Sequence, residues 1–230
     1  MTTTQRASRS WRSLLARGFA NPFKGLQVGW ALLRGYLFRF RCRIRGVRFR
    51  AGRNFRLYGR LVVGGPGEVT FGDDVEVHGL TTPLTYAHDA RILVGDNVVM
   101  ESARFGCMRE ISLGRDCMLA QVSIMDTDFH STRADRRHSD SAPVRVAPVR
   151  LGENVWIALN VGILPGVTIG DNSVVGFGAV CSRSFPANVI IVGNPAKVVA
   201  QIPSAEEGEF PRESAAPTAA PSASGAEGNA

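Results

Sequence analysis

A six-residue period over residues 151–181 constrains the fold of this chain more than any other feature. The segment divides into LGENVW, IALNVG, ILPGVT, IGDNSV and VGFGAV, each opening on an aliphatic residue, and Cys181 begins the next hexad. The period is neither the 3.6 residues of an α-helix nor the alternation of a long strand. It is typical of short strands joined by tight turns, whose coils stack their aliphatic side chains into one core. The pattern therefore predicts a coiled all-β domain.

Other positions of the hexads support the same fold. The fifth position is small or β-branched in every hexad: Val155, Val161, Val167, Ser173 and Ala179. The Gly and Asn of the GEN and GDN triplets are expected to supply turns with positive φ, which bulky residues resist. Looser copies of the hexad begin at Phe71, Val94, Leu113 and Leu119. We therefore expect the coiled domain to cover residues 60–202.

The stretch from Leu151 to Val199 carries a family resemblance. Its hexads, followed by VGNPAKVV, resemble the C-terminal half of the hexapeptide-repeat O-acetyltransferases, which include maltose, galactoside and nodulation-factor acetyltransferases and polysaccharide-modifying relatives. The resemblance extends over about residues 60–200. It implies a left-handed parallel β-helix, usually a homotrimer, that binds acetyl-CoA between neighbouring subunits. It implies no metal ion and no redox cofactor.

The repeat is interrupted once, by residues 126–148. Met125 and Leu151 are 26 residues apart where consecutive aliphatic positions should be six apart, so about 20 residues leave the coil. This loop carries two of the four histidines. Because the flat faces of a β-helix offer no pocket, a loop that reaches a neighbouring subunit is a natural way to enclose a reaction. We therefore expect the loop to carry the chemistry.

His130 lies at the start of this loop and matches the catalytic histidine of the family. An imidazole, which titrates near pH 6.5, suits the removal of a proton from a sugar hydroxyl during acyl transfer. A neighbouring carboxylate could hold the ring in the required tautomer and stabilise the imidazolium that forms. Asp128 is the first candidate for this carboxylate and Asp126 is the alternative.

The resemblance also implies a set of positions near acetyl-CoA. Trp156 matches a tryptophan that borders the family's active site, although a bulky residue that caps a coil is an equal alternative. The backbone N–H of Leu159 matches a group that could stabilise the developing oxyanion. Phe177 stands where the family has a small residue beside the pantetheine. The remaining matches are partners for the phosphates of the cofactor: Ser182, Arg183 and Lys197.

Residues 1–59 form a basic arm. Fifteen of the 27 Lys and Arg, and no Asp or Glu, lie between positions 1 and 60. Between residues 23 and 46, aliphatic and aromatic side chains recur every three or four positions among several arginines, which predicts an amphipathic helix. Such a helix either lies on an anionic membrane surface or packs on the domain or a trimer neighbour. No nucleic-acid motif accompanies the arginines, so no nucleic-acid partner is expected.

Composition also bears on the location of the chain. No apolar run approaches the roughly 18 residues that would span a bilayer, and the first residues lack the apolar core of a signal peptide. The four cysteines show neither CxxC nor zinc-ligand spacing, so we expect reduced thiols in a cytoplasmic protein. Residues 203–230 are poor in aliphatics and rich in Ala, Ser, Pro, Gly and Glu, which predicts a disordered tail.

The leading hypothesis is an acetyl-CoA-dependent O-acetyltransferase with His130 as general base. Its acceptor would be a sugar hydroxyl of an exopolysaccharide, O-antigen or other surface glycan, and a membrane-bound arm would favour a lipid-linked intermediate. A small sugar or xenobiotic acceptor, and a non-catalytic β-helix scaffold, are the alternatives. A zinc carbonic anhydrase on a similar coil would need three converging histidines. The other three histidines are interpreted as solvated surface: His78, His88 and His138.

Overall fold

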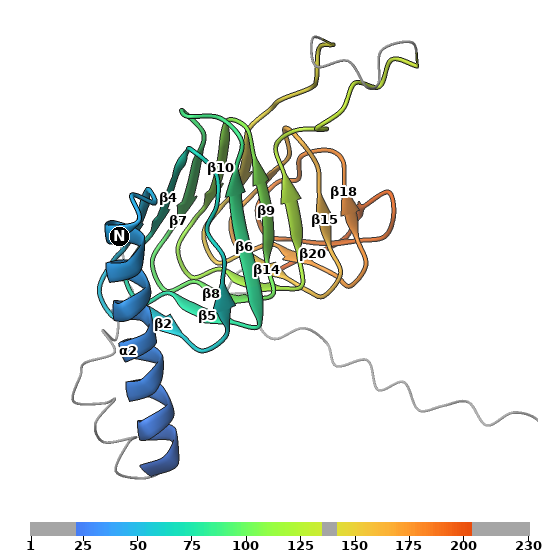
Figure 1. The fold of residues 1–230 in the computed structure, drawn as a ribbon. Helices are drawn as coiled ribbons and strands as arrows, with labels where there is room; N and C mark the ends of the chain where they lie inside the picture. Colours follow the sequence, from blue (N-terminus) through green and yellow to red (C-terminus); the bar gives the residue numbers. More distant parts are fainter. Residues whose placement is uncertain (1–21, 135–141, 204–230) are drawn as a thin grey trace, which may run out of the picture.

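The computed structural model describes residues 22–134 and 142–203, and in these ranges one helix packs against the end of a parallel β-solenoid (Figure 1). Helix α2 comprises Pro22–Ile44. The strands that follow are short and are arranged as three sheets, one on each face of the solenoid. The expected tail, the segment before Pro22 and the loop positions around His138 lie outside the described residues.

Each complete coil contributes one strand to each sheet. The first sheet contains β1 (Phe49–Ala51), β4 (Glu68–Phe71), β7 (Arg91–Val94), β10 (Glu110–Leu113), β13 (Val149–Leu151) and β16 (Thr168–Ile169). The second contains β2 (Arg56–Leu57), β5 (Glu76–His78), β8 (Val99–Glu101), β11 (Met118–Ala120), β14 (Trp156–Ile157), β17 (Val174–Val175), β19 (Val189–Val192) and β20 (Lys197–Gln201). The third contains β3 (Arg60–Leu61), β6 (Leu80–Thr85), β9 (Arg104–Cys107), β12 (Ser123–Met125), β15 (Gly162–Ile163) and β18 (Val180–Cys181). The ladders are parallel except the last, between β19 and β20.

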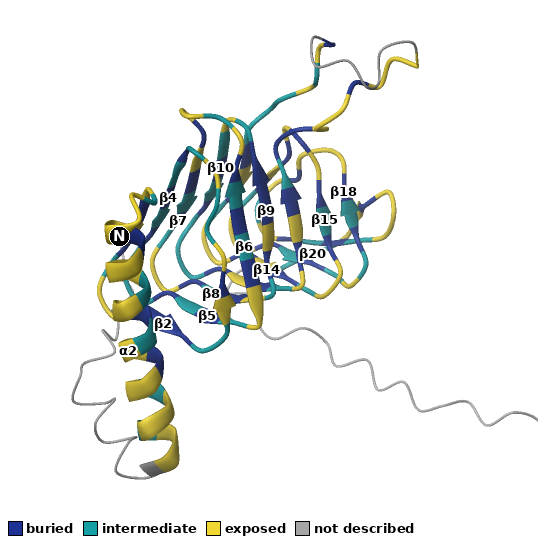
Figure 2. Ribbon diagram, in the orientation of Figure 1, coloured by how far each residue is buried: buried dark blue, intermediate teal, exposed yellow. Residues whose placement is uncertain are grey.

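The aliphatic residues of the hexads form the core of the solenoid. The first positions of the hexads, from Leu151 to Cys181, are all buried, and each stacks on the residue one coil away. Leu151 pairs with Ile169, Ile157 with Val175 and Ile163 with Cys181, so each of these coils is three hexads long. In Figure 2 the buried residues alternate with exposed ones along the strands. The predicted coiled all-β fold is confirmed.

The turns show that Asn and Gly serve different purposes. Asn154 and Asn172 adopt φ of 54° and 59°, as expected, and the Asn154 side-chain amide donates to Asn172 Oδ1 at 3.0 Å. Gly152, by contrast, is not among the residues with positive φ. A Cβ on Gly152 would collide with Asp171 Oδ1 of the next coil. The expectation was therefore wrong for this glycine, which is needed for close approach of successive coils.

The solenoid begins earlier than residue 60. Phe49 stacks on Val69, Val69 on Ile92 and Ile92 on Ile111. Each of these steps along the chain is longer than three hexads, because the corners of the early coils contain extra residues, and the insertions conceal the hexads. The coiled domain accordingly starts at Phe49, within the segment assigned to the arm.

Helix α2 packs across the open end of the first coil. Ala31 and Cys42 are buried against it, and the guanidinium of Arg34 donates to the carbonyl oxygen of Tyr58 at 2.6 Å. Phe38 of the helix meets Phe49 edge to face, with ring centroids 5.3 Å apart. One face of the helix thus packs on the domain, which is one of the two alternatives for this segment. No helix among the described residues is long and apolar enough to span a membrane.

Candidate active site

Asp126 anchors the interrupting loop to the solenoid. Its side chain is fully buried, and its two oxygens accept the backbone N–H groups of Met108, Arg109 and Glu110 at 2.7–2.8 Å. These N–H groups belong to the corner of the same coil, before β10, and would lack partners without the carboxylate. The Cys107 thiol also lies 3.4 Å from Asp126, and burial followed by this carboxylate raises the pKa of the thiol. Asp126 therefore has a structural role.

The two ends of the loop pair with each other. Thr127 and Val146 form an antiparallel bridge, the Ala147 N–H donates to the Asp126 carbonyl at 2.8 Å, and the Asp128 N–H donates to the Arg145 carbonyl at 3.2 Å. The loop thus leaves the solenoid as a short ribbon, away from the coil (Figure 1). The last core residue before it is Ile124, which is buried in register with Ile163, and not Met125 as expected from the period. The corner between β11 and β12 is therefore one residue shorter than the six-residue period predicts.

Phe129 fixes the path of the chain just before His130, and sequence reasoning missed it. Its φ is 59°, an uncommon conformation for a bulky residue. Its ring lies edge to face on Tyr86, with centroids 4.9 Å apart, and reaches over Gly106, where any Cβ would collide with it. Packing of the ring over a glycine therefore stabilises a backbone conformation that the Phe129 side chain alone disfavours.

His130 lies beyond this anchor with its side chain exposed. Its backbone N–H donates to the Asp128 carbonyl at 2.7 Å. Within the described part of the chain, no hydrogen bond or ion pair joins the His130 ring to the exposed Asp128 carboxylate. Pairing of these two side chains stays a prediction. Asp126, the alternative, already accepts hydrogen bonds from the backbone N–H groups of Met108, Arg109 and Glu110.

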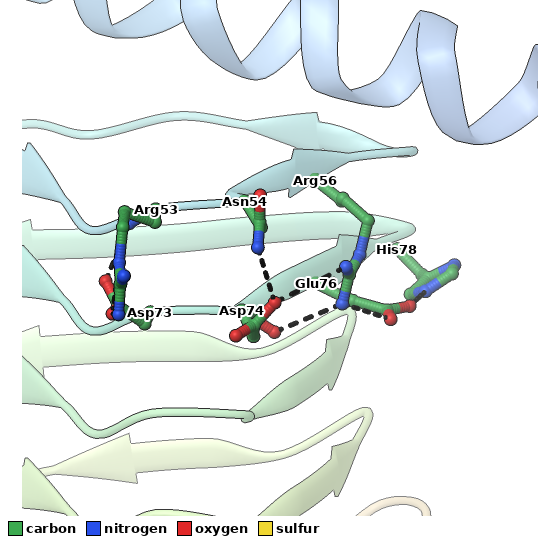
Figure 3. Close-up of polar contacts among 7 residues, drawn as sticks. All are labelled: Arg53, Asn54, Arg56, Asp73, Asp74, Glu76 and His78. Carbon is green, nitrogen blue, oxygen red and sulfur yellow. Dashed lines mark hydrogen bonds and ion pairs between the residues drawn. The ribbon is translucent and has the colours of Figure 1, made fainter. Parts of the chain in front are cut away.

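His78, interpreted from the sequence as solvated surface, has a carboxylate partner of the kind expected for His130. Its Nε2 lies 3.1 Å from Glu76 Oε2, and its ring stacks on Tyr58 with centroids 4.5 Å apart. Glu76 also accepts a 2.7 Å bond from the buried guanidinium of Arg56 (Figure 3). Further pairs across the same two coils, Arg53 with Asp73 and Asn54 with Asp74, extend this group of cross-strand contacts. We interpret the His78 pair as part of this ladder between coils.

The positions that resemble acetyl-CoA contacts are exposed on the later coils. Trp156, 52% exposed, stands beside Met118, 55% exposed, in adjacent strands of the second sheet. Leu159 and Phe177 occupy successive turns at the corner that leads to the third sheet, where the Gly178 N–H donates to the Leu159 carbonyl at 3.0 Å. The Leu159 N–H makes no hydrogen bond to another described residue. This corner thus offers apolar surface beside an available backbone donor.

The three candidate phosphate partners are also accessible. Ser182, Arg183 and Lys197 are all exposed, and the Arg183 guanidinium carbon lies 5.7 Å from the centroid of the Phe185 ring. Ser182 and Arg183 directly follow β18. They therefore lie at the edge of the third sheet from which the loop also leaves, after β12.

One chain does not bring His130 to the corner that holds Leu159. Leu159 precedes β15, whereas the loop follows the carboxyl end of the neighbouring parallel strand β12. The width of the third sheet therefore separates them, roughly 17 Å for five residues of extended chain. Within residues 22–134 and 142–203 no three His, Cys, Asp or Glu side chains are grouped so as to hold a metal ion.

Comparison with known proteins supports the resemblance seen in the sequence. The family described as bacterial transferase hexapeptide (six repeats) matches residues 148–183. Galactoside O-acetyltransferase of Escherichia coli is 49% identical over 124 residues, 52% of this chain and 59% of that protein. WcaF of Escherichia coli, provisionally named a colanic acid biosynthesis acetyltransferase, is 36% identical over 106 residues, 46% of this chain and 53% of WcaF. The chain is a hexapeptide-repeat protein related to acetyltransferases.

The hexapeptide-repeat chain spans between about half and two thirds of the length of these relatives: an acetyltransferase homologue of Schizosaccharomyces pombe, 38% identical over 139 residues, is matched over 65% of its length. Among solved structures, the N-acyltransferase AntD from Bacillus cereus, in complex with dTDP and coenzyme A, superposes with a TM-score of 0.59. The match covers 70% of this chain and 88% of AntD at 16% identity, which supports the fold alone.

Proposed function

We propose that this hexapeptide-repeat protein transfers an acetyl group from acetyl-CoA to a hydroxyl of a sugar in a surface glycan. The observation that carries the proposal is the loop at residues 126–148. A buried carboxylate and a paired stem hold its base, and Phe129 directs the chain so that His130 projects from an otherwise regular solenoid. A spacer protein would have no need of a loop so firmly held at its base.

His130 serves as the general base. Its neutral imidazole removes the proton of the acceptor hydroxyl as that oxygen attacks the thioester carbonyl carbon. The tetrahedral intermediate then collapses, the carbon–sulfur bond breaks, and the CoA thiolate takes the proton from the imidazolium. The products are the sugar acetate ester and CoA. The Asp128 carboxylate stabilises the imidazolium once substrate binding has brought the ring towards it.

The later coils bind the donor. The N–H of Leu159, which has no acceptor among the described residues, faces the thioester oxygen and stabilises the negative charge that develops on it. Trp156 and Phe177 provide apolar surface for the pantetheine arm. Cations for the CoA phosphates come from Arg183 and Lys197, with the Ser182 hydroxyl beside them.

The site is completed between copies of the chain. Because His130 and the Leu159 corner lie at opposite edges of the third sheet, the histidine of one copy acts on acetyl-CoA held by its neighbour. A homotrimer gives each loop such a neighbour. The acceptor is assigned to surface glycans because WcaF is named for colanic acid biosynthesis and another relative for galactoside acetylation.

Mass spectrometry of surface polysaccharide tests the proposal. Cells that lack the gene would be complemented with the wild-type chain, with His130→Ala, or with His88→Ala as the matched control for an exposed histidine outside the loop. We expect the wild type and His88→Ala to restore O-acetyl groups, and His130→Ala to lower acetylation by a factor of 10²–10⁴.

Thermal shift with acetyl-CoA separates binding from chemistry. His130→Ala should retain the shift, since the donor site lies on other residues. The scaffold alternative predicts two other results: complementation with the wild-type chain does not raise polysaccharide acetylation above that of cells lacking the gene, and acetyl-CoA does not raise the melting temperature of the protein. A shift with unchanged polysaccharide would point to a small sugar or xenobiotic acceptor.

A further inference from the structure

Helix α2 carries a second apolar stripe that the solenoid does not cover. Its members recur at alternating steps of three and four residues, and their exposed fractions run from 46% to 73%. They are Phe23, Leu26, Trp30, Leu33, Leu37, Phe40 and Ile44. At 100° per residue this stripe lies on nearly the opposite side of the helix from Ala31 and Cys42, which pack on the first coil. Figure 2 shows exposed residues along the outer side of α2.

Arginines flank the stripe on both sides. By the same angular spacing Arg43 lies on one side of it and Arg41 on the other, and Arg45 directly follows the helix. The side chains of Arg41, Arg43 and Arg45 form no hydrogen bond or ion pair with a described residue, and the sequence has no Asp or Glu before Glu68. The exposed apolar surface is therefore edged by cations that this part of the chain leaves uncompensated.

A groove beside the helix combines the same two properties. It lies between α2 and the first coil, has a volume of about 550 Å³, and brings Arg60 of β3 near Arg41 and Arg45. Its walls include Leu37 and Val62, both exposed. Apolar walls with a cationic rim suit a group that is anionic at one end and apolar at the other, which is the chemistry of a phospholipid.

We infer that α2 is the surface by which this protein binds an anionic lipid bilayer. The helix lies in the plane of the headgroups, with Leu26, Trp30 and Leu33 among the acyl chains and the flanking arginines on lipid phosphates. Trp30 and Tyr36 have the amphipathic rings that favour the interfacial layer. The helix spans nothing in this arrangement, and the solenoid stays in water.

A second copy of the chain is the rival occupant, because spacing by threes and fours is also typical of a helix pair. Charge argues against it. In a helix pair the positions beside the apolar seam carry opposite charges that attract across it. Here those positions hold arginines on both sides, and the absence of acidic residues from the helix means that two copies would oppose arginine to arginine. An anionic bilayer supplies the missing negative charge.

Flotation of the full-length protein with lipid vesicles tests the inference, and it needs no knowledge of the acceptor sugar. Vesicles of phosphatidylcholine with about one-third phosphatidylglycerol would be compared with vesicles of phosphatidylcholine alone. We expect the protein to float with the anionic vesicles and to be released by high salt. Because transferase activity is not measured, the outcome is independent of the proposed reaction.

Two variants with matched controls identify the binding surface. Leu26→Ser with Leu33→Ser removes two residues of the stripe and should abolish flotation, whereas Leu32→Ser with Leu80→Ser removes two other exposed leucines and should leave it unchanged. Arg41→Gln with Arg45→Gln should weaken binding about fivefold per arginine, and Arg104→Gln with Arg109→Gln, on the solenoid, should not.

Three results would overturn the inference. The first is no flotation of the wild type with anionic vesicles, and the second is equal flotation of the Leu26→Ser, Leu33→Ser variant. The third comes from light scattering without vesicles: if that variant dissociates an oligomer that Leu32→Ser with Leu80→Ser leaves intact, a second copy covers the stripe. Circular dichroism of each variant would show that α2 is still folded.

Discussion

The solenoid carries two additions that do not follow its repeat, helix α2 and the loop at residues 126–148, and they are attached in different ways. The loop is held by polar contacts: the buried Asp126 carboxylate and paired backbone at the stem. The helix is held mainly by apolar packing of one face, with Arg34 as its principal polar contact to the coil. The loop is thus fixed at its base by directional bonds, whereas the helix rests on a non-directional contact.

This difference suits what each addition is proposed to do. Acyl transfer requires a base positioned to within a fraction of an ångström, and directional hydrogen bonds at the loop base supply that order. Docking on a fluid surface requires only an exposed apolar face of the right extent. The repeat specifies the core of the solenoid, whereas the proposed base and the proposed membrane surface lie on segments that depart from it. The two attachments can be compared by measuring the unfolding free energy of loop variants and the thiol labelling rate of helix variants.

The largest effect is expected at the base of the loop. Asp126→Ala would leave three buried N–H groups without acceptors and should lower the free energy of unfolding by about 3 kcal/mol. Asp128→Ala, two positions away and exposed, should change it by less than about 0.5 kcal/mol. Urea denaturation of both variants measures the contrast. If the two variants are equally stable, the hydrogen bonds of Asp126 do not anchor the loop.

Sequence patterns reveal the loop but not its anchor. The hexads from Leu151 predict the core, and their interruption predicts the loop, because both depend on the period alone. The role of Asp126 depends on N–H groups of the preceding corner, around Arg109, which no local pattern brings together with it. Likewise Phe129 adopts positive φ because Gly106, on a neighbouring strand, leaves room for its ring. Both features depend on contacts with another strand or corner, so no local sequence pattern predicts them.

The helix shows a similar division. Steps of three and four residues predict that α2 forms and that it is amphipathic, yet two apolar stripes are present and the sequence does not say which one packs on the coil. The small residues decide it, since Gly35 lies where a Cβ would collide with the Phe55 carbonyl. The sequence does not reveal the early coils for a different reason. Extra residues at their corners make the interval between stacked residues longer than three hexads.

The second prediction concerns a substitution that weakens the attachment of the helix. Gly35→Ala forces α2 away from the Phe55 carbonyl, and overpacking of this kind costs about 1–3 kcal/mol. Alkylation of Cys42 at pH 8 reports the opening: burial raises the pKa of this thiol, while Arg41 and Arg45 oppose that increase. Release of the helix removes the burial and makes the thiolate available. Labelling of Cys42 should therefore accelerate at least fivefold.

Cys181 is the internal reference for that experiment. Burial in the solenoid core raises the pKa of its thiol to about 11, so it stays protonated at pH 8 until the coil itself opens. Its labelling rate should not change in Gly35→Ala. If both thiols accelerate together, the helix and the solenoid open as one unit, and the proposed difference between the two attachments is wrong.

The smallest effect, of opposite sign, is expected from the same substitution six positions earlier. A Cβ on Gly29 would meet nothing within 4 Å, and its φ is not positive, so Ala is accommodated there without strain. Replacing glycine by alanine inside a helix stabilises it by about 0.5–1 kcal/mol. If Cys42 becomes reactive because α2 unfolds, Gly29→Ala should slow its labelling about two- to fivefold. If α2 instead detaches as an intact helix, the substitution stabilises both states equally and the rate stays the same. The pair of glycine variants thus distinguishes detachment of the folded helix from its unfolding.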